Sequence, residues 1–210
     1  MKYSIVILAL PVVLLSCGQN DKSGKEEPGK TATEIVADKK ADSPPAEAIF
    51  SIKAAKIVFN CTAGPETGTE TLYFDDFGAV AVLITNKKSK YSVTNQTSIW
   101  KDKKTTIIDH TKKTVVKSSW RPKATEPPSL ADTDVQSRKY IGYERLADEI
   151  VAGKSCEVWF NAKQNFKYCL WKKIALKELL ETSFSKEATA VEEISEIPPA
   201  VVEIPKDYKQ

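Results

Sequence analysis

The chain has 210 residues, of which 41% are hydrophobic and 28% are charged, enough for one globular domain with a core and additional tails. Its 31 basic and 28 acidic residues give a formal net charge of +3 and are spread along the sequence, unlike the clustered basic surface of nucleic-acid-binding proteins. A single histidine leaves few residues for a histidine-rich metal site or for acid–base catalysis. Composition therefore favours a protein without a nucleic-acid partner, a metal or a cofactor.

Residues 1–16 have the pattern of a secretory signal peptide. Lys2 precedes a largely apolar run at residues 5–15, and the small residue Ser16 follows it. The run is too short to cross a bilayer, which takes a helix of about 20 residues. The sequence LLSC that ends at Cys17 resembles a bacterial lipobox, in which a peptidase cuts before the cysteine and its sulfur carries a diacylglyceryl group. The resemblance implies that the mature protein begins at a lipidated Cys17.

Lipidation at Cys17 would attach the protein to a membrane, because two or more acyl chains hold stably where a single chain does so only marginally. The residues that follow, GQND at 18–21, lack the aspartate in second position that retains lipoproteins in the inner membrane. The resemblance to lipoproteins thus implies the outer membrane, on its periplasmic face or at the cell surface. The alternative is an ordinary signal peptide that ends by chance beside a cysteine.

Residues 17–48 are predicted to combine the lipidated cysteine with a disordered tether. Their composition is dominated by Lys, Glu, Asp, Gly, Ser, Ala and Pro, with almost no aromatic or long apolar side chain before Phe50. Such a segment cannot bury enough apolar surface to offset its ordering entropy. A short helix near residues 33–40 is the alternative, and it would be marginal alone. One folded domain, with an extended C-terminal tail, is expected over residues 49–210.

Beyond Phe50 the sequence predicts a mainly β fold. Short apolar runs separated by turns rich in Gly, Asp and Lys are typical of antiparallel hairpins. The predicted strands cover residues 53–62, 69–74, 79–85, 90–100, 105–109, 114–120, 143–150, 156–160, 166–171, 175–183 and 188–194. Residues 121–136 contain several prolines and interrupt this rhythm as a long crossover, with a short helix expected near residues 132–141. We expect an antiparallel sheet with at most one or two short helices.

Two stretches resemble a known family: GTETLYFDDFGAVA at residues 68–81 and GKSCEVWFNAKQNFKYCLWKKIALK at residues 153–177. Over about residues 50–208 the chain is similar to small exported bacterial proteins of the superfamily of the outer-membrane lipoprotein carriers LolA and LolB. The resemblance implies an open or half β-barrel around an apolar concavity. Residues 121–136 are the stretch that could supply the lid of such a protein. The shared motifs are structural and imply no catalytic residue.

With Cys17 assigned to the lipid, the cysteines left in the domain are Cys61, Cys156 and Cys169. An odd number in an oxidising compartment indicates one bridge and one free thiol. A bridge between Cys156 and Cys169 would leave Cys61 free and buried. Pairing of Cys61 with either of the other two stays open as an alternative.

The register of one hairpin decides whether that bridge is possible. If residues 161–164 form a four-residue turn, Phe160 pairs with Asn165 and Cys156 lies directly opposite Cys169. Cross-strand sulfurs can be bridged in such a pair. A slip of one residue would instead place the two sulfurs on opposite faces of the sheet.

Trp159 and Trp171 lie on the two strands of the same predicted hairpin. Buried aromatic side chains at such positions commonly fill a core. In a carrier-like domain they would instead contact an apolar ligand. Both interpretations stay open, and these two residues are the candidate ligand-binding residues.

No catalytic or metal-binding arrangement is supported by the sequence. Cys61, His110 and Asp109 could be drawn as a triad, but adjacent strand residues face opposite sides, so Asp109 is badly placed to orient His110. The paired aspartates at positions 75 and 76 and at positions 132 and 134 lack the spacing of a calcium loop and fit turn formation. We therefore do not expect an enzyme.

The function expected is that of a non-enzymatic outer-membrane lipoprotein, attached through acyl chains on Cys17, whose β domain binds or shields a lipid or another apolar ligand. The alternative is a structural or interaction module that docks on an envelope protein, with a filled core and no small ligand. A hollow interior would favour the first interpretation, and an interior filled by Trp and Phe side chains would favour the second.

Overall fold

The computed structural model describes residues 43–181 and 183–209. The predicted signal peptide, Cys17 and most of the predicted tether lie outside these residues. Residues 43–47 are exposed, and the segment joins the rest of the domain where the backbone N–H groups of Ile49 and Phe50 donate to the carbonyl of Phe77 at 3.0 and 2.9 Å. Within the part of the chain that the structure describes, no helix is long and apolar enough to cross a membrane.

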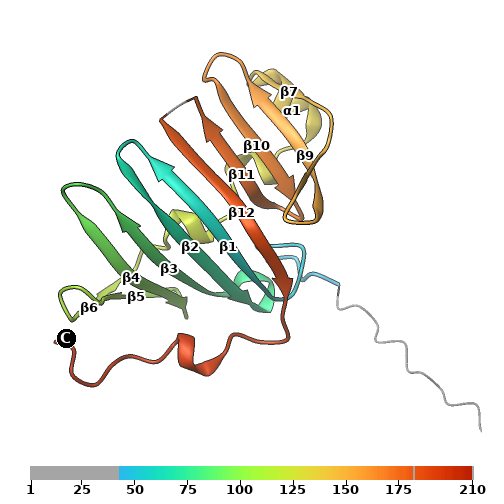
Figure 1. Ribbon diagram of the computed structural model, residues 1–210. Coiled ribbons are helices and arrows are strands. Elements are labelled where there is room, and N and C mark those ends of the chain that lie inside the picture. Colours follow the sequence, from blue (N-terminus) through green and yellow to red (C-terminus); the bar gives the residue numbers. More distant parts are fainter. Residues whose placement is uncertain (1–42, 182, 210) are drawn as a thin grey trace, which may run out of the picture. The chain divides into compact units, whose positions relative to one another are not determined.

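A twelve-stranded antiparallel sheet forms the domain (Figure 1). Its strands are β1 (Ala55–Ala63), β2 (Glu66–Asp75), β3 (Val80–Lys88), β4 (Val93–Lys101), β5 (Lys104–Asp109), β6 (Thr114–Ser118), β7 (Tyr143–Arg145), β8 (Glu149–Val151), β9 (Lys154–Asn161), β10 (Phe166–Trp171), β11 (Ile174–Leu180) and β12 (Phe184–Glu193). They lie in the order β6-β5-β4-β3-β2-β1-β12-β11-β10-β9-β7, and β8 pairs with β9. The sheet is open, so the predicted mainly β, antiparallel open fold is confirmed.

Within residues 43–181 and 183–209, helical structure is limited to one α-helix and short 3₁₀ turns. These are η1 (Asp76–Gly78), η2 (Lys123–Thr125), η3 (Ser129–Asp132), α1 (Val135–Tyr140) and η4 (Pro199–Val201). Helix α1 lies where the sequence predicts a short helix, and Asp134 caps it by accepting from the N–H groups of Gln136 and Ser137 at 2.9 and 3.0 Å. Gly142, at φ 90°, follows its end because glycine adopts this backbone conformation without strain.

One face of the sheet carries most of the core. Ile57, Phe59 and Cys61 alternate along β1, and the facing side chains of Leu72 and Phe74 on β2 are buried with them. Alternation with period two puts these apolar residues on a single face. We call it the covered face, because the chain between β6 and α1 runs across it.

The covering segment, residues 119–134, connects β6 to α1 and crosses the covered face (Figure 1). Arg121 holds it in place, since its Nη2 donates to the carbonyl of Gly78 at 2.9 Å and to that of Thr125 at 2.8 Å. Leu130 is buried beside Trp159 at the far end of the segment. The stretch predicted as a crossover thus lies where a lid would lie.

The prediction of a single strand at residues 143–150 is wrong, because this stretch forms two strands, β7 and β8. Arg145 on β7 pairs with Trp159, whereas Glu149 on β8 pairs with Cys156. Three residues, 146–148, therefore face only two on β9, and the extra residue breaks the strand as a bulge does. Arg145 also forms an ion pair with Asp148 across the break.

The predicted hairpin register between β9 and β10 is also wrong. Asn161 pairs with Phe166, so the loop covers residues 162–165 and Val158, not Cys156, lies opposite Cys169. The cause is local: Asn161 Oδ1 accepts from the N–H groups of residues 163 and 164 at 3.1 Å each, a side-chain turn that keeps Asn161 itself in the strand. The turn consequently starts one residue later than predicted.

A disulfide nevertheless joins Cys156 to Cys169, with their Cα atoms 5.4 Å apart. The actual register differs from the predicted one by two positions, and a shift of two leaves both side chains on the same face. The bridge is therefore diagonal across the strand pair. Cys61 is a buried free thiol, as expected for that pairing.

The C-terminal tail packs on the other side of β3, β4 and β5. Ile197, Val201, Ile204 and Tyr208 lie against a small cluster of Val82, Ile99, Ile108 and Val115. Near its end the tail pairs with the start of β6, because the N–H of residue 115 donates to the carbonyl of residue 209 at 2.7 Å. The hydroxyl of Tyr208 lies 3.2 Å from His110 Nδ1.

Removing the disulfide with the double substitution Cys156→Ser and Cys169→Ser should lower the free energy of unfolding by about 3 kcal/mol, the chain-entropy value for a loop of this length. Urea denaturation of both proteins measures the difference. Reductant should destabilise the parent to the same extent and leave the double variant unchanged. An equal stability of parent and variant would contradict a structural role for the bridge.

Candidate functional site

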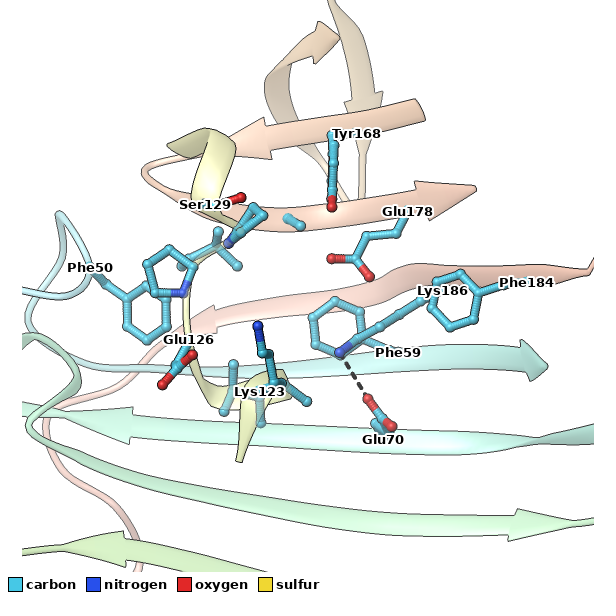
Figure 2. Close-up of a pocket in the computed structure, with 16 residues that line it drawn as sticks. Phe50, Phe59, Glu70, Lys123, Glu126, Ser129, Tyr168, Glu178, Phe184 and Lys186 are labelled. Carbon is cyan, nitrogen blue, oxygen red and sulfur yellow. Dashed lines mark ion pairs between the residues drawn. The ribbon is translucent and has the colours of Figure 1, made fainter. Parts of the chain in front are cut away.

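A cavity of about 500 Å³ lies between the covered face and the covering segment (Figure 2). The sheet supplies its floor, and residues 123–129 of the covering segment supply its roof. Pro127 and Pro128 keep this roof extended and unable to pair fully as a strand. The covering segment therefore crosses the covered face here without filling the space between them.

One part of the cavity is apolar. It is lined by Phe50 before β1, Phe59 on β1 and Leu72 on β2. From β11 it is lined by Ile174 and Ala175. The ring of Phe50 packs on that of Phe74 with centroids 4.4 Å apart, which fixes the apolar wall. An apolar group entering here would lose contact with water on several sides.

The other part contains buried charges, with Glu70 at the centre. Its Oε1 lies 2.6 Å from Lys87 Nζ. Its Oε2 lies 2.8 Å from Lys186 Nζ, the ion pair drawn in Figure 2. The side chains of Glu70 and Lys186 are only 8% and 10% exposed. The ammonium of Lys186 also lies 4.4 Å from the ring centroid of Phe59. One carboxylate thus forms ion pairs with two lysines inside the sheet face.

The pKa values in this group follow from its geometry. Burial opposes ionisation of Glu70, but the charges and hydrogen bonds of Lys186 and Lys87 outweigh it and hold the pKa of Glu70 below its usual value. Burial likewise works against the charge on Lys87, and the contact with Glu70 raises the pKa of Lys87 in spite of it. The Glu70 ion pairs are therefore formed at neutral pH.

Glu178 differs from Glu70. It lies on β11 opposite Tyr168 on β10 and Lys186 on β12, and its carboxylate points into the cavity (Figure 2). Burial raises the pKa of Glu178; Lys186 opposes this effect and Glu70 adds to it. Burial also raises the pKa of the Tyr168 hydroxyl, with the nearby Glu178 charge adding to the shift. Among the residues that the structure describes, the Glu178 carboxylate has no hydrogen bond or ion pair.

Cys61 and His110 do not form a catalytic pair. Burial, followed by the charge of Glu70, raises the pKa of the Cys61 thiol to about 11, so it is protonated and a weak nucleophile at neutral pH. His110 lies against Tyr208 of a different cluster, and its Nε2 lies 2.9 Å from Thr97 Oγ1. Over residues 43–181 and 183–209, no group of three or more His, Cys, Asp or Glu side chains is arranged to hold a metal ion.

The two candidate ligand-binding tryptophans have separate surroundings. Trp159 is 1% exposed, packs with Leu130 and lies under Arg138, whose guanidinium carbon is 4.7 Å from a ring centroid. Trp171 is half-buried and flanked by the ammonium groups of two lysines at 5.0 and 5.1 Å. It follows Leu170, the partner of Glu157, and so faces the side of the sheet opposite to Trp159. Neither ring lines the cavity.

Sequence reasoning missed the charged residues of the cavity, although a signal for one of them exists. Glu70 has the same strand parity as Leu72 and Phe74, so a strand buried on one face must carry Glu70 inward. Such an inward charge needs a partner. Glu178 shows no comparable pattern, because β11 contains a bulge next to Ala175 that changes the alternation.

A second hollow, of about 680 Å³, lies under the C-terminal tail. Ile99, Ile197 and Ile204 contribute apolar surface to it, and the charged side chains at its edge, such as Lys101 and Lys117, are exposed. It contains no buried charged group among the residues described. The cavity under the covering segment is therefore the better candidate site.

No protein-family model matches this sequence, and no curated protein is significantly similar to it. In structure the chain is similar to an uncharacterized conserved protein from Thermus thermophilus, with 7% identity and a TM-score of 0.50 over 75% of this chain and 88% of that one. It also aligns with MucB, with 13% identity and a TM-score of 0.49 over 78% of this chain and 61% of that one. It aligns as well with a chain of the Pseudomonas aeruginosa MucA/MucB complex, with 13% identity and a TM-score of 0.48 over 74% of this chain and 57% of that one. The likeness to the Thermus protein shows a shared fold alone.

Replacing Glu70 with Gln should lower the free energy of unfolding by about 3 kcal/mol at neutral pH, because two buried lysines lose their partner. The pKa of Glu70 is lowered on folding, so its contribution is fully present above a pH of about 4.3 and is lost as the pH falls through the lowered value. The difference between parent and variant should therefore shrink in acid. Chemical denaturation at several pH values measures it.

The matched control is Glu192→Gln, which removes a charge from an exposed pair 4.0 Å from Lys56. Its effect should stay below about 1 kcal/mol. A Glu70→Gln effect as small as that of the control would contradict the importance of the buried ion pairs.

Proposed function

We propose that this protein is a lipid-anchored outer-membrane protein of a bacterial envelope, related to the LolA and LolB lipoprotein carriers, whose β domain binds an amphiphilic ligand under the covering segment. The observation that carries the proposal is the cavity of about 500 Å³, a size within the range of ligand pockets, roughly 300–1,000 Å³. Trp159 and Trp171 do not fill it. The alternative of a module with a filled core is therefore less well supported.

The mixed lining favours an amphiphile over a purely apolar ligand. Phe50 and Leu72 offer apolar surface at one end, and Glu178 and Tyr168 present polar atoms at the other. A wholly apolar molecule would desolvate those polar atoms without replacing their hydrogen bonds, which costs about 1–3 kcal/mol for each group. A ligand with an apolar chain and a polar end avoids this cost.

The membrane anchor is proposed from the N-terminal sequence. A signal-like segment that ends in LLSC would place acyl chains on Cys17, and residues 18–48 would let the domain stand away from the lipid. Attachment at a membrane surface is consistent with a domain that takes up an amphiphile, because the ligand and its binding site would share one surface. The proposed role is non-enzymatic.

Native mass spectrometry of the protein purified from membranes should detect a co-purifying amphiphile in the parent and little or none in Ser129→Trp. Ser129 is an exposed residue of the covering segment that lines the cavity, so an indole there would occupy ligand space without entering the sheet core. Ser155→Trp, at an exposed position on β9 outside the cavity, is the control and should retain the ligand. A parent that repeatedly carries no ligand would count against binding.

The anchor is tested by Cys17→Ser in a bacterial host. The parent should lose residues 1–16, gain the mass of its acyl chains and partition with membranes, whereas the variant should keep its signal segment and gain no acyl mass. Intact-mass measurement distinguishes the two products. An unmodified Cys17 in the parent, with residues 1–16 still attached, would refute lipidation.

A further inference from the structure

Glu178 occupies a position where a carboxylate has no evident structural use. It lies on a central strand of the sheet, with its carboxylate directed into the cavity rather than into solvent (Figure 2). The nearest opposite charge, Lys186, is already engaged by Glu70 at 2.8 Å and by the ring of Phe59. Over the described part of the chain, no cation forms an ion pair with the Glu178 oxygens.

A carboxylate that is partly buried without a partner lowers the stability of the folded protein. The raised pKa of Glu178 reflects that cost, which arises first from burial. A side chain such as Gln or Leu would fit the same strand position without it. Unpaired polar groups held in a cavity at a cost to stability are typical of binding sites.

The surroundings of Glu178 indicate which ligand group would pair with its carboxylate. Tyr168 lies directly opposite on β10, and its hydroxyl has no hydrogen-bond partner among the described residues. The ring of Phe184 also lines this end of the cavity. An ammonium group is a donor only, so the carboxylate and the phenol oxygen can both accept from it, and aromatic faces attract cations.

An anionic group would be less suited to this end of the cavity. It would face the charge of Glu178 directly, since the Lys186 ammonium is engaged elsewhere. Lys123 and Glu126, which carry opposite charges, both line the cavity from the covering segment (Figure 2). Glu178 has no ion pair among the described residues, so a cation suits this end of the cavity better than an anion does.

We propose that the cavity selects amphiphiles whose polar end is a protonated amine, bound by the Glu178 carboxylate and the Tyr168 hydroxyl. The apolar chain of the same molecule lies along Phe59 and Leu72 towards Phe50. This inference rests on the proposed function, because it specifies the ligand of the same cavity.

The test compares three probes of equal chain length, an alkylamine, an alkanol and a fatty acid, each used as a monomer below its micelle concentration. Each probe displaces a fluorescent apolar dye from the delipidated full-length protein. The amine should bind about tenfold more tightly than the alkanol, the ratio that one charge-assisted hydrogen bond supplies, and the fatty acid should bind most weakly.

Two variants and a control assign that preference. Glu178→Gln should weaken amine binding about tenfold and leave alkanol binding unchanged, and Tyr168→Phe should reduce the amine preference in part. Glu192→Gln, an exposed carboxylate outside the cavity, should leave all three affinities as in the parent. Thermal unfolding checks the fold, and Glu178→Gln should unfold at a temperature no lower than the parent, because it removes an unpaired and partly buried charge.

Each outcome is decisive for one of the two proposals. Equal affinities for amine and alkanol, tightest binding of the fatty acid, or an amine preference that survives in both variants would overturn the amine site while leaving amphiphile binding intact. Failure of all three probes to displace the dye would overturn the proposed function itself.

Discussion

The placement of Glu70 is the constraint on which the rest of the domain depends. Its carboxylate on β2 is paired with Lys87 on β3 and with Lys186 on β12, and β1 lies between β2 and β12 with Phe59 beneath the Lys186 ammonium. The ion pairs therefore span four adjacent strands. Buried ion pairs often contribute little net stability, but they fix register, since any slip would leave a charge buried alone.

The same charges explain why the covered face has a cavity instead of a continuous core. An apolar roof could not lie flat on Glu70 and Lys186 without burying them more deeply. The covering segment instead carries prolines and small residues at this place, and its large apolar side chain Leu130 is buried further along, beside Trp159. The buried charges thus account both for the register of the strands and for the cavity under the covering segment.

Much of the fold could be predicted from the sequence, because alternation and turn residues are local signals. The strands, the crossover at residues 121–136 and helix α1 all follow from such signals. The break between β7 and β8 and the turn shift at Asn161 could not be predicted, since a single extra residue or one side-chain turn leaves no mark in the apolar pattern. At the site, the inward position of Glu70 was predictable, whereas the isolation of Glu178 depends on which partner Lys186 takes.

The C-terminal tail bears on whether copies of this open sheet aggregate through their edge strands. An unpaired edge strand offers its free N–H and C=O groups to any neighbouring strand, and a surface anchor would concentrate such neighbours. Backbone pairing between residues 115 and 209 occupies part of the β6 edge, while the opposite end of the sheet finishes in the three-residue strand β7 followed by its bulge. Both edge strands are therefore poor templates for the addition of another strand. The tail, by pairing with β6, opposes edge-to-edge aggregation.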